Sequence, residues 1–263
     1  MLPEPSLSLR REDGRDVPLL VWRFPEPLLA VSTAVHGGGV GPREWLVNAS
    51  VPMSYSRPDP DAHLREIAVE AGLDGPGIGL MTGVDVADVV SARAGVLRRD
   101  GVLGRDGVLR EDGVLRGDGG VQVWATVGLG APIAAADPSA EGFEHPAPGP
   151  GTHPAPGTHP APGTVNIVVW VPQRLADGAL INAVATATEA KAQAIAELGL
   201  AATGTATDAV VVLCPLDGPV AAYGGPRSLW GAPMARAVHR AVLDGGAVNL
   251  ATGRSWSDRH DQK

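Results

Sequence analysis

Apolar residues along this chain form two kinds of pattern: short continuous runs and longer stretches with helical spacing. The short runs predict strands over residues 28–35, 45–51, 121–127, 164–171 and 209–213. The helical spacing predicts helices over residues 62–71, 178–198 and 233–243. Because strand and helix patterns are interspersed, we expect an α/β fold with one mixed sheet, in a single domain that covers residues 17–250.

Two low-complexity segments interrupt these patterns. Residues 95–118 consist of the hexamers GVLRRD, GVLGRD, GVLRED and GVLRGD, and residues 145–163 repeat HPAPG with short spacers. The hexamers carry too few apolar side chains to form a core, and four of them would build little more than one coil of a hexapeptide β-helix. Proline and glycine predict that the second segment is a flexible linker or an extended polyproline-like loop. We therefore expect two loop insertions, one at each end of the 121–127 strand.

The predicted helix at 178–198 carries polar residues where a core helix is normally apolar. Asp177 is its expected N-cap and Gly199 its expected C′ residue. At about 100° per residue, Lys191 falls within one apolar stripe, which consists of Leu180, Val184, Ala187, Ile195 and Leu198. This lysine either reaches past the stripe to water, pairs with a carboxylate from a neighbouring strand, or acts as a functional ammonium in a cleft.

Glu189 lies on the opposite side of the same predicted helix, about 180° from the centre of the stripe. Because Glu189 and Lys191 are two residues apart, they cannot form a helix-stabilising ion pair, and each needs its own partner. Glu189 is either a solvated surface carboxylate or a catalytic one. Thr188 is β-branched, and a hydrogen bond to the preceding turn would absorb its hydroxyl.

The segment ATGTATDA, residues 202–209, leads from this helix into the next strand and brings Asp208 to the start of that strand. Its short side chains permit close backbone approach, but it lacks the Gly-Lys-Ser/Thr of a phosphate-binding loop. Asn166 interrupts the apolar run of the preceding strand. A buried asparagine must be hydrogen-bonded, to the backbone or to a ligand.

Composition excludes several partners. The formal net charge of −8 leaves no basic field for nucleic acid, and no apolar run approaches the roughly 18 residues of a membrane-spanning helix. Cys214 is the only cysteine, so an internal disulfide is impossible. The first residues lack an apolar signal core, and we expect a cytoplasmic protein.

Two classes of hydrolase, the esterases and the zinc hydrolases, fit the motifs of this sequence poorly. HGGG at residues 36–39 is typical of an esterase oxyanion loop, but no G-x-S-x-G nucleophile elbow is present. We interpret these glycines as a close-packed turn. A zinc hydrolase would need H-E-x-x-H, which is absent, and His145, His153 and His159 lie in the repeat. No metal site is expected.

Three segments, GTVNIVVWV, ATATEAKAQAIAELG and ATGTATDAVVV, resemble in order and spacing the adenosylcobinamide amidohydrolase family. Earlier segments, STAVHGGG, WLVNASVP and GLMTGVDVADV, resemble its N-terminal half. The resemblance implies hydrolysis of the amide between the corrin f side chain and aminopropanol, which yields adenosylcobyric acid. Cobalt then belongs to the corrinoid substrate, and no separate cofactor is expected. A corrinoid-binding module without catalysis is the alternative.

Amide hydrolysis needs a nucleophile, donors for the oxyanion and an acid for the leaving amine. We expect Glu189 or Asp208 to act as base for water, and Lys191 to stabilise charge or protonate the amine. The expected substrate-binding residues are Asn48, Thr82, Asn166, Thr188, Thr205 and Thr207. Of these, Asn48, Asn166, Thr205 and Thr207 are expected to donate hydrogen bonds. An acyl-enzyme through Thr205 or Thr207 stays open beside direct attack by water, as do the oligomeric state and the order of the strands.

Overall fold

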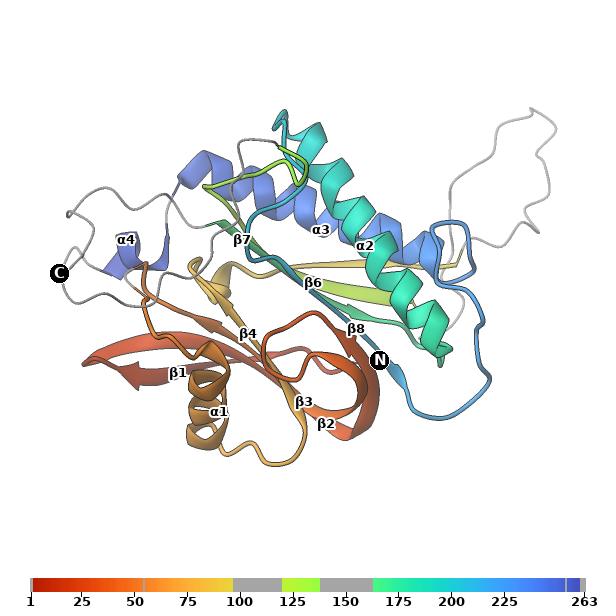
Figure 1. Cartoon of the computed structure of the whole chain (residues 1–263), viewed down its shortest axis with the longest axis horizontal. Helices are drawn as coiled ribbons and strands as arrows, with labels where there is room; N and C mark the ends of the chain where they lie inside the picture. The colour runs from red at the N-terminus through yellow and green to blue at the C-terminus, as the bar shows by residue number, and fades with distance from the viewer. Residues whose placement is uncertain (1, 54, 97–119, 138–162, 254, 261–263) are drawn as a thin grey trace.

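One mixed sheet dominates the structure, a computed structural model that describes residues 2–53, 55–96, 120–137, 163–253 and 255–260 (Figure 1). Its strands are β1 (Ser6–Glu12), β2 (Arg15–Ser32), β3 (Gly39–Ser50), β4 (Gly77–Thr82), β5 (Val90–Ala94), β6 (Val121–Leu129), β7 (Gly163–Trp170) and β8 (Ala209–Pro215). The strand order is β4-β3-β2-β8-β7-β6-β5, and β1 pairs with β2 beside this path. The predicted α/β class with a single mixed sheet is confirmed.

The long strand β2 joins two halves of the sheet. Its first part pairs with β1 and β3, and its last part, Leu28–Ser32, pairs with β3 on one side and β8 on the other. The register shifts between Arg23 and Leu28, as at a bulge, which bends a strand. The sheet therefore curls, so that β4 comes to lie against β7 without strand pairing between them.

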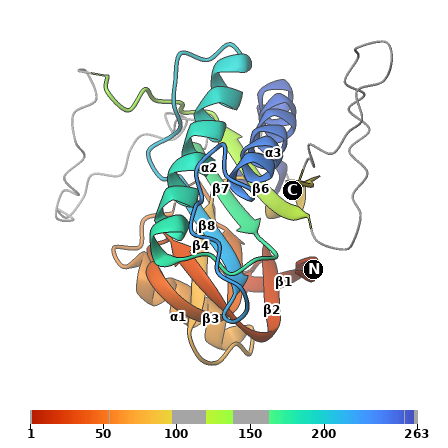
Figure 2. The same cartoon turned by 90° about the vertical axis from the view of Figure 1, so that its right-hand side faces the viewer.

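The helices cover the outer faces of the two halves. Helices α2 (Asp177–Glu197) and α3 (Gly231–Thr252) lie over β5–β8, whereas α1 (Pro60–Glu70) lies on the β2–β4 half (Figures 1 and 2). Strands β6, β7 and β8 are thus buried on both faces, against α2 and α3 outside and the other half of the sheet inside. Burial on both faces explains why their sequences are continuous apolar runs rather than alternating ones.

All five predicted strands and all three predicted helices are present, with different ends. The patterns do not predict β1, β4 and β5, because β1 carries charged residues, β4 contains two glycines and β5 is short. Helix α3 continues to Thr252, beyond the predicted end at 243. It passes through Gly245 and Gly246, where a side chain would press on Val127 and Leu198. The short helix α4 (Trp256–His260) and the 3-10 helix η1 (Val86–Asp88) were also not predicted.

The ends of α2 correct one expectation and confirm another. Ala176 occupies the N-cap position without a side-chain hydrogen bond, and Asp177 is the first helical residue instead of the cap. At this position its carboxylate still interacts favourably with the positive end of the helix dipole. Gly199 adopts a φ of 83°, as expected of a C′ glycine.

The sheet also begins earlier than residue 17, because β1 pairs with β2 along its whole length. The predicted insertions at 95–118 and 145–163 lie almost entirely outside the described residues, so their loop character stays a prediction. None of the helices that the structure describes has the length and apolar composition needed to cross a bilayer.

Candidate active site

A cavity of about 790 Å³ lies at one end of the curled sheet, where the two halves meet. One wall comes from the residues that follow β2, from β4 and from the segment after β3. The other comes from the first residues of β7 and from the residues that lead into β8. The lining is mainly apolar with a few polar groups, as in most small-molecule sites. Its polar side chains are those of Thr33, Tyr55, Ser56, Arg57, Thr82, Thr164, Asn166, Thr207 and Asp208.

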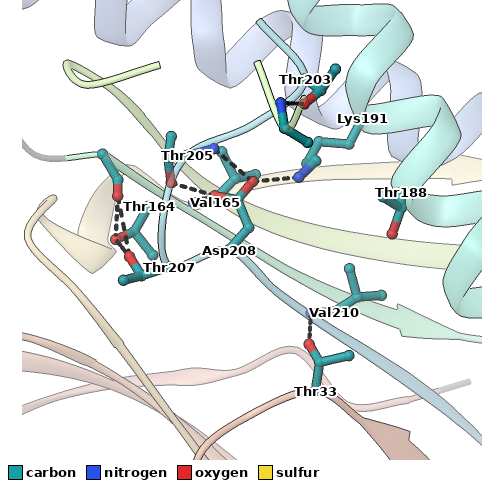
Figure 3. Close-up of polar contacts among 12 residues, drawn as sticks. Thr33, Thr164, Val165, Thr188, Lys191, Thr203, Thr205, Thr207, Asp208 and Val210 are labelled. Carbon is teal, nitrogen blue, oxygen red and sulfur yellow. Dashed lines mark hydrogen bonds and ion pairs between the residues drawn. The ribbon is translucent and has the colours of Figure 1, made fainter. Parts of the chain in front are cut away.

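Asp208 is the most heavily hydrogen-bonded side chain at this cavity (Figure 3). Its Oδ1 accepts from the backbone N–H of Val165 at 2.8 Å and from the Thr205 hydroxyl at 2.5 Å. Its Oδ2 accepts from the backbone N–H of Thr205 at 3.0 Å and from Nζ of Lys191. These four donors occupy the four acceptor sites of a carboxylate.

The Lys191–Asp208 ion pair explains the lysine in the apolar stripe of α2. The side chains of Lys191 and Asp208 are only 8% and 10% exposed, so each charge is removed from water and compensated by the other. Of the three interpretations of Lys191, pairing with a carboxylate from a neighbouring strand is the one that the structure contains. The pair also ties α2 to the loop that precedes β8.

Gly204 makes this pairing sterically possible. A Cβ atom at this position would overlap both the Asp208 carboxylate and Nζ of Lys191. The same loop is held from the other side, because Ile133 N–H donates to the Gly204 carbonyl at 2.8 Å and Thr203 N–H donates to the Ile133 carbonyl at 2.9 Å. The small residues of the ATGTATDA segment therefore serve close packing around a buried ion pair.

Two threonine hydroxyls lie beside Asp208 on the cavity wall. Oγ1 of Thr164 and Oγ1 of Thr207 are 2.7 Å apart, and both are within hydrogen-bond distance of the Gly163 carbonyl (Figure 3). Thr207 is exposed, so its hydroxyl can exchange these partners for a ligand. The pair provides donors next to the carboxylate of Asp208.

An amide network crosses the interior between the two halves of the sheet. Nδ2 of Asn166 donates to Oδ1 of Asn48 at 3.0 Å and to the Met81 carbonyl at 2.9 Å, and Nδ2 of Asn48 donates to Oγ1 of Thr126 at 3.0 Å. Because the Met81 carbonyl can only accept, it fixes the orientation of both amides. Both Asn166 N–H bonds are used, so its Oδ1 is left for the cavity. Asn166 thus offers an acceptor rather than the expected donor.

The remaining predicted site residues have different positions. Thr82 lines the cavity, but its Oγ1 accepts from the Val84 N–H at 3.3 Å. Thr205 lies behind Asp208 and is outside the lining. Thr188 is exposed on α2, and its hydroxyl donates to the Val184 carbonyl at 2.9 Å, which is the anticipated bond to the preceding turn.

Glu189 is not brought to the cavity. It is exposed in a separate hollow between α2 and α3, together with Arg236 and His239. The reason is helical geometry, since two residues along a helix rotate a side chain by about 200° and Lys191 faces inward. The position corresponds to the surface interpretation of Glu189.

Sequence reasoning missed several cavity residues from the N-terminal half. Thr33 accepts a hydrogen bond from the Val210 N–H at 3.0 Å, and Tyr55 and Arg57 lie in the segment after β3. Thr33 belongs to STAVHGGG, but no spacing marks it as a site residue. Arg57 is held by Glu66 at 2.7 Å, and this hydrogen bond raises the pKa of the guanidinium.

The HGGG segment is structural in this fold. Nδ1 of His36 is 2.8 Å from Oδ1 of Asp61, and its ring stacks on Trp45 at 5.7 Å. The hydrogen bond to His36 is the main cause that lowers the pKa of Asp61. Gly37 has a φ of 69°, and a side chain there would overlap the Gly77 carbonyl, which confirms the close-packed turn.

Within the described residues, no group of three or more His, Cys, Asp or Glu side chains is placed to hold a metal ion. The three repeat histidines, His145, His153 and His159, lie outside that part of the chain.

The cavity brings a carboxylate, hydroxyl groups and an amide together in a curled α/β sheet, and such groups can serve acid–base chemistry and oxyanion stabilisation. The comparison with known families is more specific. The chain belongs to the adenosylcobinamide amidohydrolase family, whose model matches residues 4–102 and 107–253. It is therefore an amide hydrolase.

Two relatives carry the name of this family. The chain is 27% identical to an adenosylcobinamide amidohydrolase of Methanosarcina mazei over 225 residues, which cover 82% of this chain and 88% of the relative. It is 44% identical to a protein of the same name from Halobacterium salinarum over 80 residues, 30% of this chain and 34% of that one. A crystal structure of a Pyrococcus horikoshii protein covers 92% of this chain, and 83% of its own, with a TM-score of 0.41 and 9% identity.

Proposed function

We propose that this chain hydrolyses the amide between the corrin f side chain and aminopropanol in adenosylcobinamide or a related cobamide. The products are adenosylcobyric acid and free aminopropanol, and the cobalt is carried by the corrinoid. Family membership supports the reaction class. The observation that carries the proposal is that Asp208, with Lys191 behind it, is the one carboxylate that lines the cavity in the described part of the chain.

Asp208 is the base in this proposal. All four of its acceptor sites are occupied, so it can take a proton from water only if one donor leaves. Two of the donors are fixed backbone N–H groups, whereas Lys191 has a flexible side chain. We infer that Nζ of Lys191 turns aside as water attacks the amide carbon. Asp208 then passes the proton to the leaving nitrogen, and Lys191 returns to the carboxylate.

The threonine pair and Asn166 bind the reacting amide. As the carbonyl oxygen gains negative charge, the hydroxyls of Thr164 and Thr207 can rotate from each other toward it and donate. Oδ1 of Asn166 accepts from the amide N–H of the substrate, which orients the scissile bond.

Attack by a threonine is the second mechanism. Thr205 is the candidate, because its hydroxyl donates to Oδ1 of Asp208 at 2.5 Å, the geometry of a nucleophile and its base. It lies outside the cavity lining, which favours water. A Thr205→Val variant separates the two mechanisms. Attack by water does not use the hydroxyl of residue 205, whereas an acyl-enzyme forms through that hydroxyl.

We place this reaction in corrinoid salvage in the cytoplasm. Cys214 is a buried free thiol, which is compatible with a reducing compartment. The test is incubation of the purified chain with adenosylcobinamide, followed by chromatography for adenosylcobyric acid and aminopropanol. We expect both products in equal amounts, and neither with Asp208→Asn. Binding of the corrinoid without product would overturn the proposal in favour of a corrinoid-binding module.

A further inference from the structure

A second hollow of about 380 Å³ adjoins the cavity, and the two share Tyr55, Ser56 and Arg57 as a common wall. Ser56 and Arg57 are exposed, so the top of this wall reaches the surface between the two openings. The volume of the second hollow is within the range of small-ligand sites, which begins at about 300 Å³. One extended ligand can therefore occupy both hollows across the wall.

The second hollow is polar but electrically almost balanced. Three arginines, Arg10, Arg11 and Arg57, face four carboxylates, those of Glu12, Asp13, Glu66 and Glu70. Burial lowers the pKa of His63, which adds no positive charge at neutral pH. This balance disfavours an anion such as a phosphate and favours an uncharged ligand with many hydrogen-bonding groups.

Two features of the hollow match a nucleoside. The rings of Tyr55 and His63 stack with centroids 5.6 Å apart and planes at 12°, which forms an aromatic wall beside Pro52 and Ile67. Glu66 is bound to Arg57 and Glu12 to Arg10, whereas Asp13 and Glu70 have no ion-pair partner among the described residues. Free carboxylates accept hydrogen bonds from the hydroxyl pair of a ribose, and aromatic rings stack on a purine.

We propose that this hollow, lined by Tyr55, His63, Asp13 and Glu70, is a nucleoside subsite that holds the adenosyl group of the corrinoid while the amide arm enters the cavity. The inference rests on the proposed function, because that substrate carries both groups. The adenosyl group then contributes to substrate binding across the wall, at a distance from the reacting amide.

The first experiment compares adenosylcobinamide with hydroxocobinamide, which lacks the nucleoside. We expect the wild type to have a KM at least about tenfold lower for the adenosylated form, and this ratio to fall to between one and three in Tyr55→Leu and in Glu70→Gln. Tyr223, the other tyrosine, is 76% exposed and lies outside both hollows. Tyr223→Leu is the matched control, in which the ratio stays at the wild-type value.

The outcomes separate the two proposals. Equal KM values for both corrinoids in the wild type would overturn the subsite and leave the amide hydrolysis intact. If neither corrinoid is hydrolysed, the proposed function fails, and calorimetric titration of the full chain with 5′-deoxyadenosine then decides the subsite. Binding that is lost in Tyr55→Leu and kept in Tyr223→Leu supports it, and absence of binding to the wild type overturns it.

Discussion

At the scale of single residues, the buried Lys191–Asp208 pair has a structural role, to which the proposed mechanism adds a chemical one. Four hydrogen bonds converge on one carboxylate, which fixes the loop that carries Thr205 and Thr207. Methionine preserves the apolar stem of Lys191, and on that ground alone Lys191→Met would be expected to spare stability. The structure changes that expectation, since the variant would leave Asp208 buried without its counter-charge.

We predict that Lys191→Met lowers the free energy of unfolding by about 3–5 kcal/mol and turnover by at least about 10²-fold. The double variant Lys191→Met/Asp208→Asn removes both charges, so it should regain part of the stability without regaining activity. Urea denaturation and product assays on the double-mutant cycle measure both effects. Restored turnover in the double variant would remove Asp208 from the mechanism.

Glu189 provides the contrasting case. Because it is exposed between α2 and α3 and does not line the cavity, we predict that Glu189→Gln keeps turnover within about twofold of the wild type, whereas Asp208→Asn loses at least about 10²-fold. Steady-state kinetics of the two variants, with corrinoid binding measured in parallel, make the comparison. A collapse of turnover in Glu189→Gln would return this residue to the catalytic set.

Gly204 tests the packing of the same site without removing a functional group. We predict that Gly204→Ala lowers the free energy of unfolding by at least about 2 kcal/mol and reduces turnover, because its Cβ would separate Lys191 from Asp208. Gly178, on the exposed side of α2, has nothing within 4 Å of a Cβ and is the control. Gly178→Ala should stabilise the helix by up to about 1 kcal/mol. Equal stability in both variants would contradict the close approach.

At the scale of elements, α1 acts as the support for the cavity wall. Tyr55 stacks on His63 and Arg57 is bound by Glu66, so two side chains of the wall are fastened to one helix. Burial lowers the pKa of His63 in the folded state, although Glu12 nearby acts in the opposite direction. Below the unfolded pKa of about 6.5, the unfolded chain therefore binds more protons than the folded one.

Protonation of His63 therefore favours the unfolded state, so stability should decrease as the pH falls below about 6.5. We predict a smaller decrease for His63→Phe, which keeps a stacked ring but cannot be protonated. Urea denaturation of both proteins between pH 7.5 and pH 5 measures the difference. Identical pH dependence in the two proteins would exclude His63 as the titrating group.

At the scale of the whole molecule, the fold explains how the repeat at 95–118 can be accommodated. Strands β5 and β6 are antiparallel neighbours, and Ala94 lies directly opposite Val121. A short turn can therefore join the two strands, since hairpin connections of two to five residues are common. The ladder between them needs nothing from the repeat.

We predict that replacing residues 95–118 by a short Gly/Ser bridge changes the melting temperature by only a few degrees and leaves turnover within about twofold. Thermal unfolding and the corrinoid assay on the shortened chain provide the test. An insoluble protein, or one that melts far below the parent, would mean that the repeat contributes to the fold.

Much of the architecture follows from the sequence itself. Strands β6, β7 and β8 are buried on both faces and α2 has an apolar stripe, so their periodicity predicts their type. The same pattern identified Lys191 as a residue that needed a partner. Charged β1 and glycine-containing β4 gave no such signal, because their place in the sheet depends on pairing rather than on their own composition.

Only the tertiary structure decided which of these residues meet. Periodicity reports the face that a residue occupies on its own element, but not the partner of that face, which depends on long-range register and on the curl of the sheet. Asn48 and Asn166, 118 residues apart in the chain, are brought together in this way, as are Lys191 and Asp208. Curling also brings the N-terminal strands over β7 and β8, which adds Thr33 and Tyr55 to the cavity.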